Sequence, residues 1–128
     1  MDKLSYSVSS NKSFDELSAL LEKTSPEMGF RVLAVHNVQE TLAGKGFEIE
    51  PLKIFEVCNA GFADKALGND INVAMFMPCK IVLRPENEKT RMTLVRPSMI
   101  AEMLPDAGLG ELAGQVEKQL IEIMDAVK

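Results

Sequence analysis

The sequence has few of the residues that mark a specialised protein. Its 128 residues include no tryptophan, one tyrosine and only two cysteines. Two cysteines do not make a disulfide framework, which favours a reducing compartment. The net charge is −5 with no basic patch or stripe, so we expect no nucleic-acid partner. No apolar run approaches the roughly 20 residues of a spanning helix, and the first residues do not resemble a secretion leader. We therefore expect a cytoplasmic protein without a membrane partner.

The motifs of the common enzyme classes are also missing. The chain has no nucleophile elbow, phosphate-binding loop or dinucleotide fingerprint. It has no Cys-x-x-Cys pair, and its single histidine, His36, cannot form a ligand cluster alone. We therefore expect no metal and no cofactor, and whether the protein is an enzyme stays open. A Met-x-Met-Pro-Cys run at residues 75–79 is compatible with soft-metal chemistry such as Cu(I), but methionines more often fill cores and interfaces.

Alternation of apolar and polar residues predicts five strands. They cover about residues 3–9, 30–36, 52–58, 79–83 and 90–96. The second predicted strand is fairly apolar on both faces, so we place it inside the sheet. The four residues Glu86 to Lys89 suit a tight hairpin between the last two strands.

Helical spacing of apolar residues predicts two main helices, over residues 13–25 and 109–127. Shorter helices are expected at 38–43 after the cap Asn37, at 60–68 after Asn59, and at about 99–104. The fold class is therefore α+β. We expect one domain, residues 1–128, with a single layer of about five mostly antiparallel strands and both main helices on one face. The element order is β-α-β-β-β-β-α plus short connector helices, and a parallel βαβ arrangement stays open. The predicted buried stripes are Leu17, Leu21, Leu112, Val116 and Leu120.

The two cysteines mark the candidate site. Cys58 closes the third predicted strand and Cys79 opens the fourth, so antiparallel pairing would bring both thiols to one end of the sheet. Asn59 would cap the following helix, whose free N–H groups and dipole favour a thiolate at Cys58. Lys65 and Lys80 could add positive potential nearby. The alternative is that both cysteines are buried and pack as small hydrophobic residues.

Glu56 is the one acid in register with apolar neighbours, Leu52 and Ile54. A buried carboxylate could serve as a general acid or base. The alternative is a charge at the strand edge that reaches solvent. The candidate ligand-binding residues are therefore Glu56, Cys58, Asn59, Cys79 and Lys80.

Several of these segments resemble one known family. They are the Gly-Phe-x-Val-Leu pattern at residues 29–33, the Ile-Phe-Glu-Val-Cys-Asn strand end at 54–59, Ala-x-x-Ala-Leu at 63–67 and Met-Pro-Cys at 77–79. Over about residues 28–97 the chain is similar to the domain-of-unknown-function family numbered 302. The resemblance implies a compact α+β fold and a tendency to form homodimers. It implies no reaction, because the family's biochemical role is not established. The chain departs from the family pattern at Ala60, at Lys80 and at His36-Asn37.

Two functions from different classes fit these observations. The first is a non-enzymatic homodimeric module that binds a small ligand or a protein partner near the Cys58–Cys79 end of the sheet. The second is a thiol-dependent redox or sulfur-transfer activity that uses Cys58. The first is favoured because no general base or oxyanion device accompanies the cysteines. We expect the dimer contact among apolar residues outside the assumed core face, which are Leu33, Val35, Phe55 and Val57.

Overall fold

The structure is a computed structural model that describes residues 3–128. Five antiparallel strands form one sheet in the order β1-β5-β4-β3-β2. The strands are β1 (Ser5–Ser10), β2 (Arg31–Asn37), β3 (Lys53–Cys58), β4 (Cys79–Glu86) and β5 (Lys89–Val95). The α+β prediction is therefore confirmed, and the parallel alternative is wrong.

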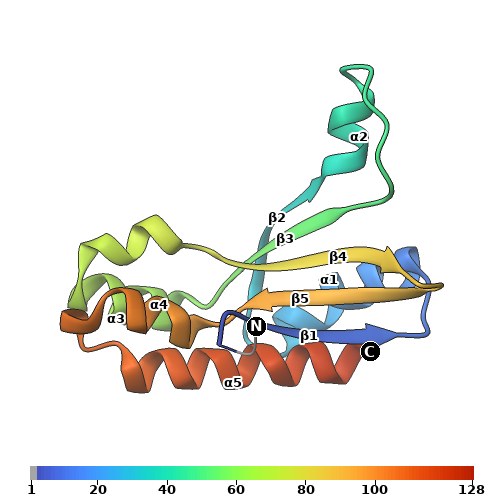
Figure 1. The fold of residues 1–128 in the computed structure, drawn as a ribbon. Coiled ribbons are helices and arrows are strands. Elements are labelled where there is room, and N and C mark those ends of the chain that lie inside the picture. The colour runs from blue at the N-terminus through green and yellow to red at the C-terminus, as the bar shows by residue number, and fades with distance from the viewer. Residues whose placement is uncertain (1–2) are drawn as a thin grey trace.

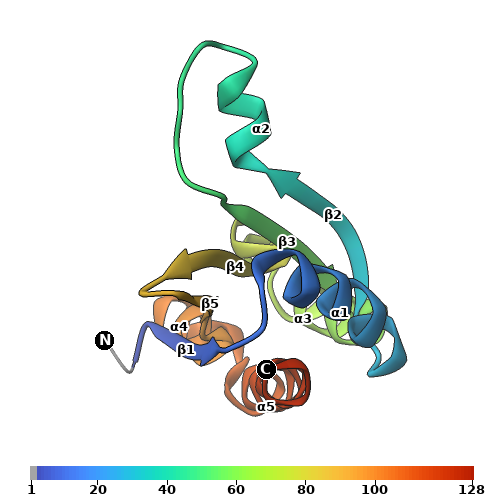
Figure 2. The same ribbon diagram turned by 90° about the vertical axis from the view of Figure 1, so that its right-hand side faces the viewer.

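The two main helices lie on one face of the sheet, as predicted. They are α1 (Phe14–Glu27) and α5 (Gly110–Val127). Figure 2 shows α5 below the strands and α1 to the right of β1, β4 and β5. Shorter helical segments connect the strands: α2 (Val38–Ala43), α3 (Ala60–Asn69), α4 (Pro97–Met103), and the 3-10 turns η1 (Ile71–Phe76) and η2 (Pro105–Ala107). Within residues 3–128, no helix combines the length and apolar character needed to cross a membrane.

Local sequence signals set the ends of these elements. The N-caps Ser13, Asn37 and Asn59 each accept a hydrogen bond from the backbone N–H three residues on, at 3.0–3.1 Å. The β4–β5 hairpin turns at Asn87 and Glu88, whose φ angles are 52° and 65°. Two consecutive residues with positive φ are what a tight two-residue hairpin requires.

The core lies between the sheet and the two main helices. Leu17 and Leu21 of α1, Leu120 of α5 and Phe55 of β3 are fully buried in one cluster. Leu112 at the other end of α5 is only half-buried, as is Val116, because both line a cavity. The buried stripe is therefore confirmed for α1 and for the second half of α5.

The position predicted for the second strand is wrong, because β2 is at the edge of the sheet. A bulge between Val32 and Ala34 interrupts its pairing with β3. The extra residue lets Val32 and Val35 both pack against the core and leaves Leu33 51% exposed. The bulge explains why both faces of this strand are apolar in the sequence.

The predicted dimer patch is also wrong for most of its residues. Phe55 and Val57 are fully buried, since their side of β3 faces α1 and α5. Val35 packs against the same core. Of the four residues, only Leu33 is exposed. The side of β3 that carries no helix is the one with Ile54 and Glu56.

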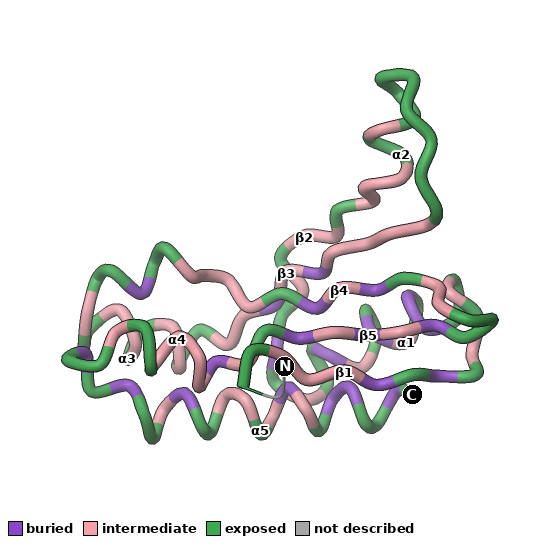
Figure 3. Tube along the Cα trace, in the orientation of Figure 1, coloured by how far each residue is buried: buried purple, intermediate pink, exposed green. Residues whose placement is uncertain are grey.

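The segment between β2 and β3 forms an arm, residues 38–52. Figures 1 and 2 show this arm, which contains α2, rising from the sheet on the side opposite α5. Every residue from Ala43 to Glu50 is exposed, so the loop of the arm is green throughout in Figure 3.

Candidate functional site

A cavity of about 90 Å³ lies where β3 ends and β4 begins. In Figure 1 this is the left-hand end of the molecule, with η1 above, α3 and α4 overlapping at mid-height and α5 below. Side chains from the strand ends and from α3, η1, α4 and α5 line the cavity. Besides the two thiols, Asn59 is the one polar side chain in this lining within residues 3–128. The site is therefore almost wholly apolar.

Small residues keep the cavity open. Ala63 and Ala66 of α3 line one wall of the cavity, and Ala113 of α5 lines the wall opposite. Protein interiors are otherwise close-packed, and longer side chains at these positions would fill the space. Phe62 and Phe30 close the end nearest the main core, with ring centroids 6.3 Å apart.

A second small apolar cluster closes the far end. Val73 of η1 packs with Ala107 and Leu109 beside the start of α5. The Asn69 side-chain N–H donates to the Gly108 carbonyl, 3.2 Å away. The end of α3 is thus tied to the turn before α5 at this end of the cavity.

Both cysteines line this cavity as free thiols, and each is half-buried. Cys79 is paired in the sheet with Val57, the residue before Cys58. Burial raises the pKa of the Cys79 thiol to about 11, and charge on Cys58 acts in the same direction, against a smaller opposite effect of Lys80. At neutral pH Cys79 is therefore a neutral thiol that packs against its neighbours.

Asn59 is placed at the cavity by its capping role. Its side-chain oxygen accepts from the Phe62 N–H at 3.1 Å, and its side-chain N–H donates to the Gly29 carbonyl at 2.9 Å. Both ends of the amide are thus engaged within the protein. The cavity therefore offers mainly its shape and its apolar surface.

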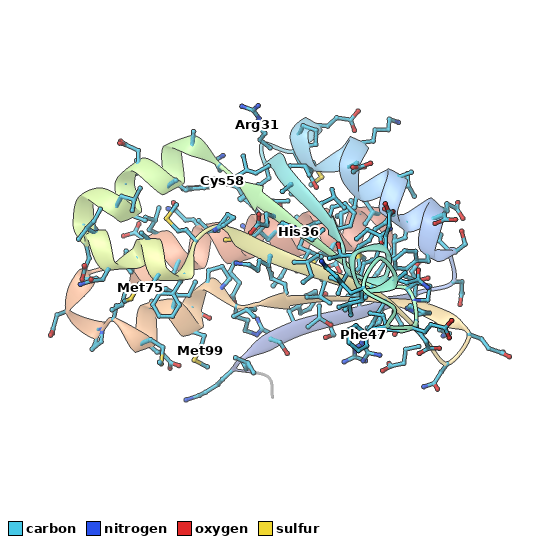
Figure 4. All side chains as sticks on the ribbon, turned by 90° about the horizontal axis from the view of Figure 1, so that it is seen from above. Arg31, His36, Phe47, Cys58, Met75 and Met99 are labelled. Atoms are coloured by element: carbon cyan, nitrogen blue, oxygen red, sulfur yellow. The ribbon has the colours of Figure 1, made fainter. Side chains whose placement is uncertain are left out.

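Lys80 and Glu56 lie on the other side of the sheet. They pair with each other across β3 and β4, with Lys80 Nζ and Glu56 Oε2 4.0 Å apart. Glu56 Oε1 is 3.0 Å from His36 Nε2 on β2. Figure 4 looks down on this side, with His36 towards the arm and Cys58 towards the cavity. The structure thus brings Cys58, Asn59 and Cys79 together and separates Glu56 and Lys80 from them.

The family model for the domain of unknown function DUF302 matches residues 6–127. The chain belongs to this family. A crystal structure of an uncharacterized conserved DUF302 protein from Bacillus stearothermophilus is similar, with 33% sequence identity, a TM-score of 0.92 and 98% of each chain covered. No curated protein matches the chain. The resemblance to the DUF302 family is therefore confirmed, and the match extends beyond the central segments to nearly the whole chain.

The sequence patterns did not indicate much of the wall of this cavity. The turn η1 contributes Val73 and Phe76, and α4 contributes Ile100. One local signal for η1 was present, because Asp70 is a good cap and its side chain accepts from the Asn72 N–H at 2.9 Å. Within the Met-x-Met-Pro-Cys run, residues 77–79 line the cavity, whereas Met75 is 72% exposed. Among residues 3–128, no three His, Cys, Asp or Glu side chains are grouped to hold a metal ion.

Proposed function

We propose that this protein is a single-domain, non-enzymatic binding module that holds a small apolar ligand in the cavity between α3 and α5. The observation that carries the proposal is the lining, which joins apolar side chains from both strand ends and four helical segments around about 90 Å³. Small-molecule sites are concave and mostly apolar, and few occur in one protein. The cavity lining also includes Cys58, Asn59 and Cys79, three of the five candidates indicated by the sequence.

The size of the cavity limits the ligand. Drug-sized ligands occupy about 300–1,000 Å³, and an engineered cavity of about 150 Å³ binds benzene. A volume of about 90 Å³ therefore suits a small apolar molecule, or the apolar end of a longer one that extends past η1. Ile71 and Met75 of η1 are exposed by 71% and 72%, so apolar surface continues outside the cavity.

Thiol-dependent redox or sulfur-transfer chemistry at Cys58 is the second candidate function. Cys58 is half-buried, lines the cavity and precedes the N-terminus of α3. Its neighbour Cys79 does not serve as a thiolate at neutral pH, because burial raises its pKa to about 11. No histidine, lysine or carboxylate belongs to the cavity lining within residues 3–128, so no side chain there is suited to act as a base. These features favour binding over catalysis.

We also propose that the protein is a homodimer in a reducing compartment such as the cytoplasm. The homodimer is supported by a sheet face without helices and by exposed apolar residues beside it, including Leu33 and Val95. The compartment is supported by the two free thiols.

The proposed ligand site is tested with dissolved xenon, a probe that enters apolar cavities. Methyl groups of Ala66, Met77 and Ile100 line the cavity, and their NMR shifts should change saturably as the xenon pressure rises. Ala66→Leu should abolish these changes because the added carbons occupy the cavity. Shifts that stay linear with pressure, or that persist in Ala66→Leu, would contradict a binding cavity.

A matched control is available in the same helix. Ala60 is exposed at the first position of α3 and does not line the cavity. Ala60→Leu makes the same chemical change and should leave xenon binding intact. Both variants should unfold at denaturant concentrations close to wild type, which shows that lost binding is not lost folding.

A further inference from the structure

The arm, residues 38–52, has apolar side chains that the rest of the described chain, residues 3–128, leaves partly or largely in solvent. Phe47 is 63% exposed and Ile49 is 38% exposed. The hydrogen bonds at these positions stay inside the arm: Phe47 N–H donates to Leu42 O, and Gln39 Nε2 donates to Ile49 O at 3.2 Å. Because the arm continues β2 and β3, it stands away from the sheet in both Figures 1 and 2. Phe47 and Ile49 together give this projection an exposed apolar surface, which suits a contact with another molecule.

The sheet has a matching surface that no helix of residues 3–128 covers. Strand register places Ile54, Val82 and Thr93 side by side across β3, β4 and β5 on the side opposite the core. Val95, further along β5 on the same side, is 50% exposed. This helix-free face also lies on the side from which the arm rises, as Figure 2 shows.

The arm and the helix-free face carry opposite charge. The arm has three acidic residues, Glu40, Glu48 and Glu50, and one basic residue, Lys45. The helix-free face, following the register, has four basic residues and two acidic ones. The basic residues are Lys80, Arg84, Lys89 and Arg91, and the acidic residues are Glu56 and Glu86. A positive face is unusual on a chain whose net charge is −5, and it complements the acidic arm.

We propose that the arm of each copy lies across the helix-free face of a second copy of this chain. The proposal rests on the homodimer proposed above and specifies the surfaces that form it. A two-fold axis makes the contact reciprocal, so that each copy gives one arm and receives one. Phe47 is the apolar anchor of the arm, and Val82 lies near the centre of the surface that receives it. Glu48 and Glu50 set the orientation through the basic residues of the face.

A charge exchange tests this arrangement by sedimentation velocity. Phe47→Lys removes the apolar anchor and places a positive charge against the basic face of the second copy. Val82→Glu places a negative charge against the acidic arm of the second copy. Each variant alone should raise the dimer dissociation constant at least tenfold. An equimolar mixture of the two variants should recover a dimer that contains one copy of each. In this dimer one arm-to-face contact is wild type, and in the other contact the lysine of Phe47→Lys meets the glutamate of Val82→Glu. Raising the salt concentration should weaken the wild-type dimer.

Controls separate the outcomes. Ile71 is 71% exposed on η1, outside both surfaces, so Ile71→Lys should leave the dimer unchanged. Val82 is half-buried, so Val95→Glu, at an exposed position of the same face, replaces Val82→Glu if that variant does not fold. A wild-type monomer at micromolar concentration would overturn both the homodimer and the arm contact. A dimer that resists both single variants, or a mixture that stays monomeric, would overturn the arm contact and leave the homodimer standing.

Discussion

Asn59 is hydrogen-bonded to Gly29 across 30 positions of sequence, with its side-chain N–H 2.9 Å from the Gly29 carbonyl oxygen. Gly29 has a φ of 92° and makes the turn from α1 into β2. Because the Asn59 oxygen also caps α3, one side chain fixes the start of α3 against the start of β2. The contact holds Cys58 and Phe62 on the wall of the cavity.

Replacing Asn59 should therefore destabilise the protein in two separable ways. Asn59→Ala removes the cap and the bond to Gly29, and should lower the free energy of unfolding by about 1–2 kcal/mol. Asn59→Asp keeps an oxygen for the cap but cannot donate to the Gly29 carbonyl, so its loss should be smaller. Urea denaturation measures both values. Equal losses in the two variants would show that the cap contributes nothing.

The cavity should make the two halves of α5 respond differently to truncation. Leu120 is fully buried, so Leu120→Ala should lower the free energy of unfolding by about 2–5 kcal/mol. Leu112, two turns earlier, is half-buried beside the cavity, and Leu112→Ala should cost clearly less because it loses fewer contacts. Chemical denaturation of both variants checks this order. A larger loss at Leu112 would contradict an open cavity.

Glu117 should make the stability depend on pH. Burial acts to raise the pKa of this carboxyl, but hydrogen bonds from Ser98 and the Arg96 guanidinium outweigh it and hold the pKa below its ordinary value of 4.5. A lowered folded-state pKa adds stability above the unfolded-state pKa, and that stability is lost as the pH falls through the folded-state value. Wild type should therefore lose stability below about pH 4.5.

Glu117→Gln keeps the shape of the side chain and removes the charge. It should lower the free energy of unfolding by about 1–3 kcal/mol at pH 7 and flatten the acid limb of the stability curve. Glu86→Gln is the control, because the pKa of Glu86 is also lowered, mainly by its hydrogen bond to Arg84, but this pair lies at the surface. Identical acid limbs in wild type and Glu117→Gln would contradict the role given to Glu117.

The thiols should differ in reactivity. In Cys58→Ser the remaining thiol is Cys79, whose pKa stays raised because burial is the largest cause of its shift. Its alkylation by iodoacetamide at pH 8 should therefore be much slower than that of a free thiol and should still be rising with pH above 9, the ordinary pKa of a thiol. Cys79→Ser tests the second candidate function, which requires Cys58 to react near neutral pH. If Cys58 reacts only after unfolding, thiol chemistry at this site is excluded.

The strands of the sheet could be predicted because each one has a recognisable pattern in its own residues. Alternation of apolar and polar residues predicted β3, β4 and β5, and prolines and a tight turn indicated where these strands begin or end. Three N-capping side chains indicated where helices begin. The strand order was harder, because the bulge at Leu33 puts apolar residues on both faces of β2 and gives an edge strand the pattern of a central one. Choosing the wrong core face for β3 then assigned Phe55 and Val57 to the surface.

The cavity could be predicted only in part. Antiparallel pairing brings Cys58 and Cys79 to one end of the sheet, and this follows from the sequence. The far wall depends on Val73 and Ile100, which lie in a 3-10 turn and a short helix with no long periodic pattern. Their meeting is a matter of tertiary packing, so no local signal reveals it. Glu56 and Lys80 lie on the face of the sheet opposite the core, away from the cavity, because side chains alternate along a strand. This separation could have been predicted from the sequence if the core face of β3 had been assigned correctly.

The central claim is that the cavity binds apolar ligands, and the most direct measurement is the affinity for straight-chain alcohols of increasing length by titration calorimetry. Each methylene buried in the cavity should add about 0.8 kcal/mol, or about fourfold in affinity, until the cavity is full. Ala66→Leu should remove this increment and Ala60→Leu should keep it. An affinity that does not change with chain length, or the same increment in wild type and Ala66→Leu, would contradict the account.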